Sequence, residues 1–385
     1  MKRTPIAHVV LPRPSLERPV SELAWDAAVA LSTSRALEVE VIIPVPARAA
    51  RKLAVRARAQ GPLADWPEGL EETLAGLTPR PQIVHYPPIP FRALEAAAAT
   101  VAAHLVGRRR ALRPALLFGA VLDEAGFVAA EAARALGAST LVSAHGIDVA
   151  AKSRRTRSTL AHATRVLAAS PALKAGLGLL GRSSELFPAA ADAIRFPLLP
   201  PAPDTSPLAL YVGPKTRARG LVSLIEALER CAVPGLRLRV IGNSAPDLDL
   251  PVLVHSLGLE GKVELFGELS HAALAPHFAE AKLVVIPAPT EGLPTAAIEG
   301  LLSGRPVVAV DSPGTREVVD SSVGALVAPE DPTALAHGIQ QVLAGQYEPA
   351  ALRRRALPYT WQEAGPKLLA HTLELIGRSE AEEPA

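Results

Sequence analysis

The 385-residue sequence has one cysteine, few aromatic side chains and no long apolar run. A single thiol, Cys231, excludes a disulfide framework and a cysteine-rich metal site, and it fits a reducing compartment. Aromatic residues make up 4% of the chain, too few for the stacking platforms that bind single-stranded nucleic acid, so we expect no nucleic-acid partner. No apolar stretch reaches the roughly 18 residues that predict a membrane span. Lys2 and Arg3 precede a short strand-like run rather than an extended apolar segment, so we expect no signal peptide and a cytoplasmic location.

Net charge is also low, but it is unevenly divided. The whole chain carries +2, whereas residues 1–200 have 25 Lys and Arg against 16 Asp and Glu, a net +9 that leaves −7 for the rest. Two clusters, Arg108–Arg113 and Lys152–Arg157, contribute to this excess. A basic half predicts an anionic partner, and peripheral contact with the inner face of an anionic membrane is one expectation. Solvated helix ends rich in arginine are the alternative.

Short β-rich runs alternate with helical runs along the whole chain. Together with 49% hydrophobic and 20% charged residues, this length and alternation predict an α/β protein with two doubly wound parallel sheets. The run Pro197–Pro207 has five prolines in eleven residues and interrupts the alternation. Such a run forms neither a helix nor a central strand, so it is predicted to be a connector. We therefore expect a first domain over residues 1–200 and a second over residues 201–358.

The segment Pro287–Gly300, PAPTEGLPTAAIEG, is the strongest candidate for a ligand site. The apolar run Leu283–Ile286 predicts a strand, and a helix is predicted to begin near Pro294–Thr295 after a turn-rich loop. At such a junction, free backbone N–H groups and the positive end of the helix dipole bind anions. Glu291 lies in the loop and Glu299 about one turn into the helix. An ordinary strand–helix connection, with one solvated and one capping glutamate, is the alternative.

The spacing EGLPTAAIE, followed by GRPVVAVDSPGTREVVDSSVGALVAPEDPTALAHGI, resembles the retaining GT-B glycosyltransferases, above all glycosyltransferase family 4. The resemblance implies two Rossmann-like domains that face each other across a cleft, with a nucleotide-sugar donor bound by the second. It also implies that Glu299 binds the nucleotide ribose and that Glu291 lies beside the sugar. The loop implied to hold the donor pyrophosphate comprises Gly292, Leu293, Pro294 and Thr295.

The segment LYVGPKTRARG opens the second half and resembles the family's V-G-R…K-G loop, which binds the diphosphate. Gly213 and Gly220 permit tight turns and a close approach to a phosphate. Arg219 occupies the position of the family's lysine. Pro214 stands where the family has its arginine, and Lys215, one residue further on, is expected to supply that charge instead.

Two further loops resemble the family's turns beside the base and the ribose. They are VIGNSAP, which contains Asn243, and LFGELS, which contains Gly267 and Glu268. Ordinary packing turns after strands are the alternative. The pattern DLD at Asp247–Asp249 resembles the metal-binding pair of the other glycosyltransferase fold. Here it follows the base loop, and the family resemblance implies that no metal or other cofactor is required.

In the first half, the best match is AHGID, which follows the strand-like run Thr140–Ala144. It resembles the family's H-G-x-D motif, so His145 is implied to contact the donor sugar near the reaction centre. A structural histidine is the alternative. At the other end, YTWQEAGPKLLAHTLELI resembles the family's final helix, which crosses back to the first domain. That helix is expected over residues 359–376, with a disordered tail over residues 377–385.

Together these matches predict a retaining, metal-independent, hexosyltransferase-type enzyme. It would move a sugar from a UDP- or GDP-sugar to a glycan, lipid-linked or small-molecule acceptor, in polysaccharide or glycoconjugate synthesis. Lys215 and Arg219 would stabilise the leaving diphosphate, and His145 and Glu291 would form the catalytic pair. Two alternatives stay open: a nucleotide-sugar epimerase or hydrolase on the same fold, and a non-catalytic protein that binds nucleotide-sugars.

Overall fold

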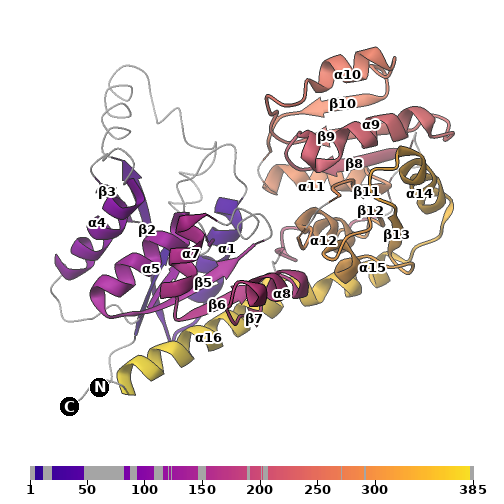
Figure 1. The fold of residues 1–385 in the computed structure, drawn as a ribbon. Coiled ribbons are helices and arrows are strands. Elements are labelled where there is room, and N and C mark those ends of the chain that lie inside the picture. The colour runs from indigo at the N-terminus through magenta and orange to yellow at the C-terminus, as the bar shows by residue number, and fades with distance from the viewer. Residues whose placement is uncertain are drawn as a thin grey trace, which may run out of the picture. The chain divides into compact units, whose positions relative to one another are not determined.

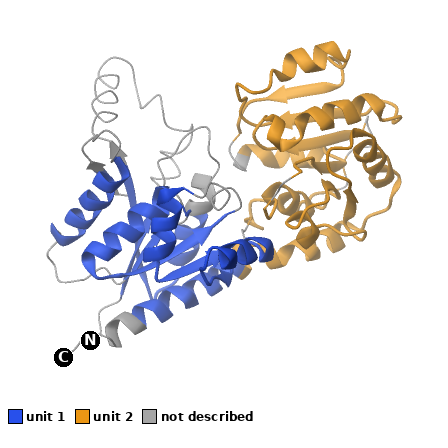
Figure 2. Cartoon of the chain, viewed as in Figure 1, with its two compact units in different colours: residues 1–188, 364–385 blue, residues 189–363 orange. Residues whose placement is uncertain are grey.

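The computed structural model divides the chain into two compact units, shown in Figures 1 and 2. Unit 1 comprises Met1–Pro188 with Ala364–Ala385, and unit 2 comprises Ala189–Glu363. The structure describes residues 5–11, 20–46, 82–86, 93–107, 116–119, 121–122, 124–145, 153–188, 191–200, 202, 207–269, 271–289 and 292–381.

Unit 1 contains a seven-stranded parallel sheet in the order β3-β2-β1-β4-β5-β6-β7. Its strands are β1 Ile6–Val10, β2 Glu38–Pro46, β3 Gln82–Tyr86, β4 Leu116–Gly119, β5 Ser139–Ala144, β6 Arg165–Ala168 and β7 Glu185–Leu186. Its helices within the described ranges are α1 Val20–Ser32, α4 Ala93–Gly107, α5 Glu124–Leu136, α7 Arg154–His162 and α8 Pro171–Leu179.

Small residues bring the helices of unit 1 close to its sheet. Buried alanines of α4 and α5 pack against apolar side chains of β1, β2 and β4. A Cβ placed on Gly119 in β4 would lie 2.5 Å from the Cα of Gly126 in α5, so this strand and helix meet backbone to backbone. The strands are apolar on both faces because a parallel sheet is covered on both sides.

Unit 2 contains a six-stranded parallel sheet in the order β10-β9-β8-β11-β12-β13. Its strands are β8 Leu208–Val212, β9 Arg237–Ile241, β10 Val263–Phe266, β11 Leu283–Ile286, β12 Val307–Val310 and β13 Gly324–Val327. Its helical segments are η1 Arg217–Arg219, α9 Leu221–Arg230, α10 Leu250–Ser256, α11 His271–Glu280, α12 Thr295–Leu302, α13 Thr315–Val318, α14 Pro332–Ala344, α15 Pro349–Ala356 and η2 Leu357–Tyr359.

The strand order confirms the prediction of doubly wound α/β sheets. In unit 2 the chain proceeds outward from β8 to β10 and then returns to the other side of β8 with β11. The order therefore switches between β8 and β11. In open parallel sheets, ligands bind beyond the carboxyl ends of the strands at such a switch point.

The division between the units differs from the predicted boundary at residue 200. The segment 191–200 belongs to unit 2 because two buried or half-buried arginines bind its carbonyl groups. Arg305 donates to Pro200 O at 2.6 Å, and Arg353 donates to Phe196 O at 2.7 Å and Ala193 O at 2.9 Å. Phe196 also packs edge-to-face on Phe278, with 5.4 Å between ring centroids.

The C-terminal helix is also longer than predicted. Helix α16 spans Trp361–Ala381 and contributes Trp361–Glu363 to unit 2 and the rest to unit 1. Residues 377–381 are therefore helical and not a disordered tail, because good helix formers follow Gly377 and offset its cost of about 1 kcal/mol. Arg165 on β6 donates to Glu374 of α16 at 2.8 Å, which ties the helix to the unit 1 sheet. Among the described helices, none has the length and apolar character needed to cross a membrane.

Candidate functional site

Four predicted donor-binding segments follow four neighbouring strands of unit 2. The strands β10, β9, β8 and β11 lie side by side in this order and run parallel. Their carboxyl ends therefore meet at one edge of the sheet, on both sides of the switch point. The loops at this edge contain the candidates Gly213, Lys215, Arg219, Gly220, Asn243, Gly267, Glu268, Gly292, Leu293, Pro294 and Thr295.

The loops after β8 and β9 are in direct backbone contact. Gly242 has φ 148°, and a Cβ at this residue would lie 2.0 Å from the carbonyl oxygen of Gly213. Beyond the strands, the Lys215 N–H donates to the carbonyl oxygen of Asn243 at 2.8 Å, so the pairing continues into the loops. Tyr211 donates its hydroxyl to Pro214 O at 2.8 Å, which fixes the turn where Pro214 replaces the expected arginine.

A second close contact joins the loop after β8 to the loop after β11. Gly220 adopts a left-handed conformation with φ 74°, and a Cβ at this residue would lie 2.0 Å from Pro287 O. Just before it, Thr216 caps the short turn η1, and its hydroxyl accepts the Arg219 N–H at 3.2 Å. Only glycine fits at residue 220, because it needs both a positive φ and the space beside Pro287.

Lys215 is the most unusual charge at this edge. It is 5% exposed, and in the described part of the chain no side chain forms an ion pair or hydrogen bond with its ammonium group. Burial lowers its pKa. A buried ammonium group without a counter-charge is unfavourable, and an anion bound beside it would remove that cost.

The two predicted nucleoside loops are also joined. Asn243 after β9 donates its side-chain amide to Glu268 Oε2 at 2.7 Å, and the Gly242 N–H donates to Gly267 O at 3.2 Å. Gly267 and Glu268 are exposed, so both remain accessible to a ligand.

Helix α12 begins one residue after Pro294, and this N-cap residue provides no side-chain hydrogen bond to the first N–H groups. Thr295 in its first position is exposed, whereas Leu293 and Pro294 are buried. Uncapped N–H groups at the N-terminus of a helix form an anion site. Glu299 lies one turn into α12 as predicted and is 3% exposed.

Of the two predicted catalytic residues, one is not among the described residues and the other belongs to unit 1. Glu291 lies outside the described residues. His145 follows β5 in unit 1, where its Nε2 lies 3.2 Å from the hydroxyl of Ser143. The assignment of both as the catalytic pair therefore stays a prediction.

The sequence analysis missed the contact between Arg217 and Asp247. Arg217 donates its backbone N–H to Asp247 Oδ2 at 3.0 Å and its Nε to Asp247 O at 2.9 Å. Asp249, by contrast, caps α10 and accepts the Val252 N–H at 3.2 Å. The two aspartates of the DLD pattern therefore bind different segments, η1 and α10. In the described ranges, no group of three or more His, Cys, Asp or Glu side chains could hold a metal ion. Asp249 could have been found from the helix-start pattern, but Asp247 acts 30 residues from its partner and has no local signal.

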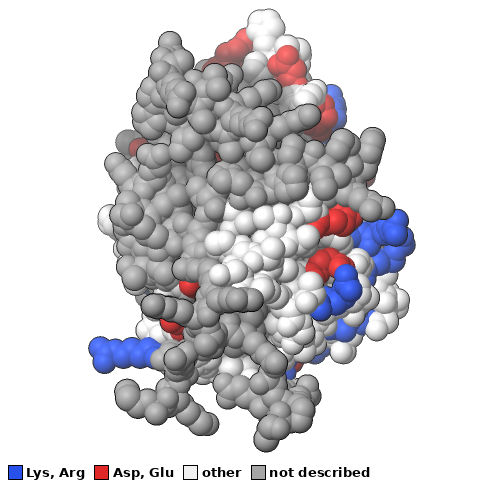
Figure 3. Space-filling model, turned by 90° about the vertical axis from the view of Figure 1, so that its left-hand side faces the viewer, with Lys and Arg blue, Asp and Glu red and all other residues white. Residues whose placement is uncertain are grey.

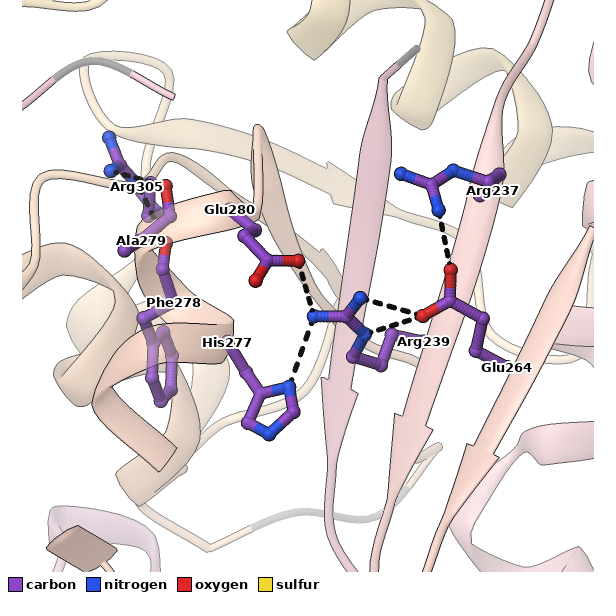
Figure 4. Close-up of polar contacts among 8 residues, drawn as sticks. All are labelled: Arg237, Arg239, Glu264, His277, Phe278, Ala279, Glu280 and Arg305. Atoms are coloured by element: carbon purple, nitrogen blue, oxygen red, sulfur yellow. Dashed lines mark hydrogen bonds and ion pairs between the residues drawn. The ribbon is translucent and has the colours of Figure 1, made fainter. Parts of the chain in front are cut away.

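A charged cluster lies beneath the loop after β10 (Figure 4). Arg239 on β9 donates to Glu264 at 2.7 Å, to Glu280 at 2.8 Å and to His277 Nδ1 at 3.0 Å. The guanidinium carbon of Arg239 lies 5.3 Å from the centroid of the Phe266 ring, and Phe266 directly precedes the loop with Gly267 and Glu268. Burial and the charge of Arg239 lower the pKa of His277. The cluster joins α11 to β9 and β10 and so supports the predicted base loop.

Residues 199–357 match the family model described as glycosyl transferases group 1. Among curated proteins, the chain is 31% identical over 176 residues to a D-inositol 3-phosphate glycosyltransferase from Xylanimonas cellulosilytica, an alignment that covers 43% of this chain and 42% of that protein. It is 28% identical over 143 residues to an alpha-D-kanosaminyltransferase from Streptomyces kanamyceticus, covering 36% of this chain and 37% of that protein. The matched part thus spans less than half the length of these relatives.

Solved structures resemble the chain over nearly its whole length. Sucrose-phosphate synthase from Thermosynechococcus elongatus has a TM-score of 0.75 at 20% identity, covering 98% of this chain and 100% of that one. HepE from Anabaena in complex with UDP has a TM-score of 0.70 at 17% identity, covering 97% of this chain and 100% of that one. At these identities the likeness shows the fold, which is GT-B with two Rossmann-like domains.

Proposed function

Because residues 199–357 match the family model of group 1 glycosyl transferases and the chain has a GT-B fold, we propose that the chain transfers a sugar from a nucleotide-sugar to an acceptor. One observation carries this proposal. In the described part of the chain no side chain partners the buried ammonium group of Lys215, which lies in a loop at the switch point of the unit 2 sheet, the edge at which the N-terminus of α12 also lies. A diphosphate is the kind of anion that such an edge binds.

The donor roles follow from this placement. Lys215, Arg219 and the start of α12 would hold the diphosphate and stabilise the charge that develops on it as the sugar leaves. Gly213 and Gly220 give the backbone the room to approach the phosphates. Glu299 would bind the ribose, and the loops with Asn243, Gly267 and Glu268 would bind the nucleoside.

The proposed reaction proceeds with retention of configuration and without a metal. The bond between the sugar and the diphosphate breaks, a bond to the acceptor oxygen forms on the same face, and the acceptor proton passes to a diphosphate oxygen. His145 and Glu291 would position the sugar. HepE structures hold UDP, glucose or UDP-glucose, which supports a UDP-sugar as the first donor to test and a GDP-sugar as the second.

The acceptor would be bound by unit 1, and it could be a glycan, a lipid-linked molecule or a small molecule. Arg154, Arg155 and Arg157 lie in the first turns of α7, exposed and without an ion pair in the described part of unit 1. Positive charge at a helix N-terminus opposes the helix dipole, so these arginines do not stabilise α7. Figure 3 shows several basic side chains at the right-hand edge of the face that it draws, next to acidic ones, and another basic side chain at the lower left. The other predicted basic cluster, Arg108–Arg113, lies outside the described residues, as does Lys152.

This charge supports an anionic acceptor or peripheral contact with the inner, anionic face of the cytoplasmic membrane. Each basic side chain near such a surface contributes about 1 kcal/mol, and salt screens the attraction. Co-sedimentation with liposomes tests the membrane. Binding that requires anionic lipid and disappears in high salt supports contact, whereas protein that stays in the supernatant at low salt indicates a soluble acceptor.

The transfer itself is tested by a donor screen. At one hundred times its dissociation constant, a bound nucleotide-sugar stabilises the folded protein by about 2.7 kcal/mol, which a thermal shift detects. Product analysis by NMR then separates the alternatives: transfer with retained anomeric configuration, hydrolysis or epimerisation of the donor, or binding without turnover. If no nucleotide-sugar or nucleoside diphosphate raises the melting temperature, the proposed function is wrong.

A further inference from the structure

Arg217 and Asp247 form a reciprocal pair between the loop after β8 and the loop after β9. The carboxylate of Asp247 accepts the backbone N–H of Arg217 at 3.0 Å, and the backbone carbonyl of Asp247 accepts the Nε–H of Arg217 at 2.9 Å. Each residue thus gives its side chain to the other's backbone. Both lie at the surface, so the pair contributes little to the core.

The pair stabilises a turn of only three residues. The 3-10 turn η1 has three residues, Arg217–Arg219, and its first N–H has no partner within the turn. Asp247 supplies that partner from another loop, in the way that an N-cap side chain does within one chain segment. Thr216 supplies the next acceptor, for the Arg219 N–H. Together the two acceptors fix the backbone that carries Arg219.

The same loop after β9 also holds the backbone before the turn. Asn243 O accepts the Lys215 N–H at 2.8 Å, so the stretch from Lys215 to Arg219 is fixed at its start by Asn243 and at Arg217 by Asp247. Both predicted diphosphate-binding side chains lie on this stretch. A basic side chain binds a phosphate well only when its backbone is already in place, because ordering it during binding costs entropy.

We propose that Asp247 is a positioning residue for the donor site, holding the η1 turn through Arg217 so that Lys215 and Arg219 are in place for a diphosphate. This inference rests on the proposed donor function. It also assigns a role to the first aspartate of the DLD pattern, which the metal-independent reaction leaves unused. The nucleoside loop and the diphosphate loop are thereby coupled through one carboxylate.

Asp249 provides the matched control. It is an exposed aspartate two residues away in the same loop, and its side chain also accepts a backbone N–H. Its partner, however, is Val252 in α10 and not the η1 turn. Asp249→Ala therefore removes a cap of the same chemistry from the same loop while leaving Arg217 in place.

The test measures binding of UDP and of GDP to the full chain by calorimetry. For the nucleotide that the wild type binds, Asp247→Ala should weaken affinity roughly tenfold, the size expected for one lost hydrogen bond to a charged group. Asp247→Asn should restore binding to within about twofold, because the amide oxygen still accepts the Arg217 N–H. Asp249→Ala should bind like the wild type, and in transfer assays Asp247→Ala should raise the donor KM more than it lowers kcat.

Limited digestion with trypsin provides a readout that needs no nucleotide. Trypsin cleaves after Arg217 and after Arg219 only when the turn opens, so Asp247→Ala should be cut there faster than the wild type, and Asp249→Ala should not. Unchanged cleavage at these two bonds would show that Asp247 does not hold the turn. Faster cleavage with unchanged nucleotide affinity would overturn the positioning role. If the wild type itself binds neither nucleotide, the proposed donor function has failed, and the trypsin result still decides whether the pair fixes the turn.

Discussion

Each unit contains a doubly wound parallel sheet, but the described glycines of the two units are placed differently. In unit 2, backbone meets backbone at the carboxyl edge of the sheet: the Gly220 and Gly242 positions each lie against a neighbouring carbonyl oxygen, where a Cβ would come within 2.0 Å. In unit 1, the comparable close approach, between Gly119 and Gly126, joins a helix to a strand. Unit 2 therefore uses Gly220 and Gly242 to shape the predicted ligand site, in addition to glycines such as Gly338 that pack its core, whereas the described close approach in unit 1 packs a helix on a strand.

This difference explains why the family match begins at residue 199. Loops that fit against one another's backbone and against a nucleoside diphosphate accept few residue types, so their sequence is recognisable. The proposed acceptor-binding unit would have to change with its acceptor, and side chains can change without altering the sheet beneath them. The difference between the two units therefore fits the proposed combination of a common donor site with a variable acceptor site.

The sharpest test of the comparison is Gly220→Ala. The added methyl group would meet Pro287 O, and the residue would keep a left-handed conformation. We expect a loss of about 3 kcal/mol or more in the free energy of unfolding, because strain and a clash add. Urea titration measures it.

Gly181→Ala in unit 1 is the matched control for Gly220→Ala. Gly181 has φ 75°, almost the same conformation, but apart from its two chain neighbours no described residue has an atom within 4 Å of its added Cβ. Only the conformational cost of about 1 kcal/mol should remain. Equal losses in the two variants would mean that the contact with Pro287 is unimportant and that the two units use such glycines alike.

The next largest effect is expected for Glu299→Ala. If Glu299 binds the ribose hydroxyls, the variant loses two charge-assisted hydrogen bonds of about 1.5–3 kcal/mol each, and affinity for the nucleoside diphosphate should fall by more than about 100-fold. Glu124→Ala, at the start of α5 in unit 1, removes a carboxylate from a helix start in the other unit and should leave affinity unchanged. Calorimetry with UDP compares them, and wild-type affinity in Glu299→Ala would refute the ribose assignment.

Only part of the candidate site could be predicted from the sequence. Glycines that need a positive φ, helix starts and strand ends leave local signals, so the strands and the loops after them could be predicted, whereas the donor-binding roles of these loops stay predictions. Contacts between residues far apart in the sequence leave none: those of Asp247 with Arg217, and of Arg239 with Glu264, Glu280 and His277, could be found only in the structure.

The predicted boundary at residue 200 differs from the division between the two units for a related reason. The proline-rich run correctly indicated an irregular segment, but carbonyl contacts decide which unit holds it. Arg305 and Arg353 bind the carbonyl groups of residues 193–200 and fix that segment to unit 2. The choice of these two arginines as partners depends on the fold as a whole, because they lie 105 and about 160 residues away along the chain.

Lys215→Met should weaken nucleotide binding by less than Glu299→Ala does. It should also make the folded protein more stable in the absence of nucleotide. Burial lowers the pKa of Lys215, which means that the folded state disfavours the charged form of the side chain. The folded protein is therefore more stable while Lys215 is neutral, and it loses this stability as pH falls through the lowered pKa. At neutral pH the charge is therefore a cost, and the variant should be more stable than the wild type without nucleotide. Affinity for UDP should fall roughly 10- to 30-fold, because Arg219 still binds the diphosphate.

Lys174→Met in unit 1 is the control for Lys215→Met. Lys174 is exposed on α8, so its replacement should change neither nucleotide affinity nor stability by much. Thermal melts with and without UDP measure both quantities.

If Lys215→Ala leaves transfer intact while Arg219→Ala abolishes it, Lys215 has not taken the place of the arginine that Pro214 replaces.

The smallest expected effect is the pH dependence that His277 gives to unit 2. Burial, followed by the charge of Arg239, lowers its pKa, while Glu264 and Glu280 oppose the shift. A histidine with a lowered folded pKa contributes stability that is complete above its ordinary pKa of about 6.5 and is lost as pH falls from there through the folded pKa. Protonation would also place a proton on the Nδ1 that accepts from Arg239. Urea titrations between pH 8 and pH 5 should show the free energy of unfolding declining below about pH 6.5, with a shallower decline in His277→Gln, whose amide oxygen still accepts from Arg239. His371→Gln is the control, because it removes an imidazole from unit 1. In that variant the part of the decline in unfolding free energy that is due to His277 should persist. An unchanged slope in His277→Gln would show that the cluster beneath the base loop does not couple proton binding to folding.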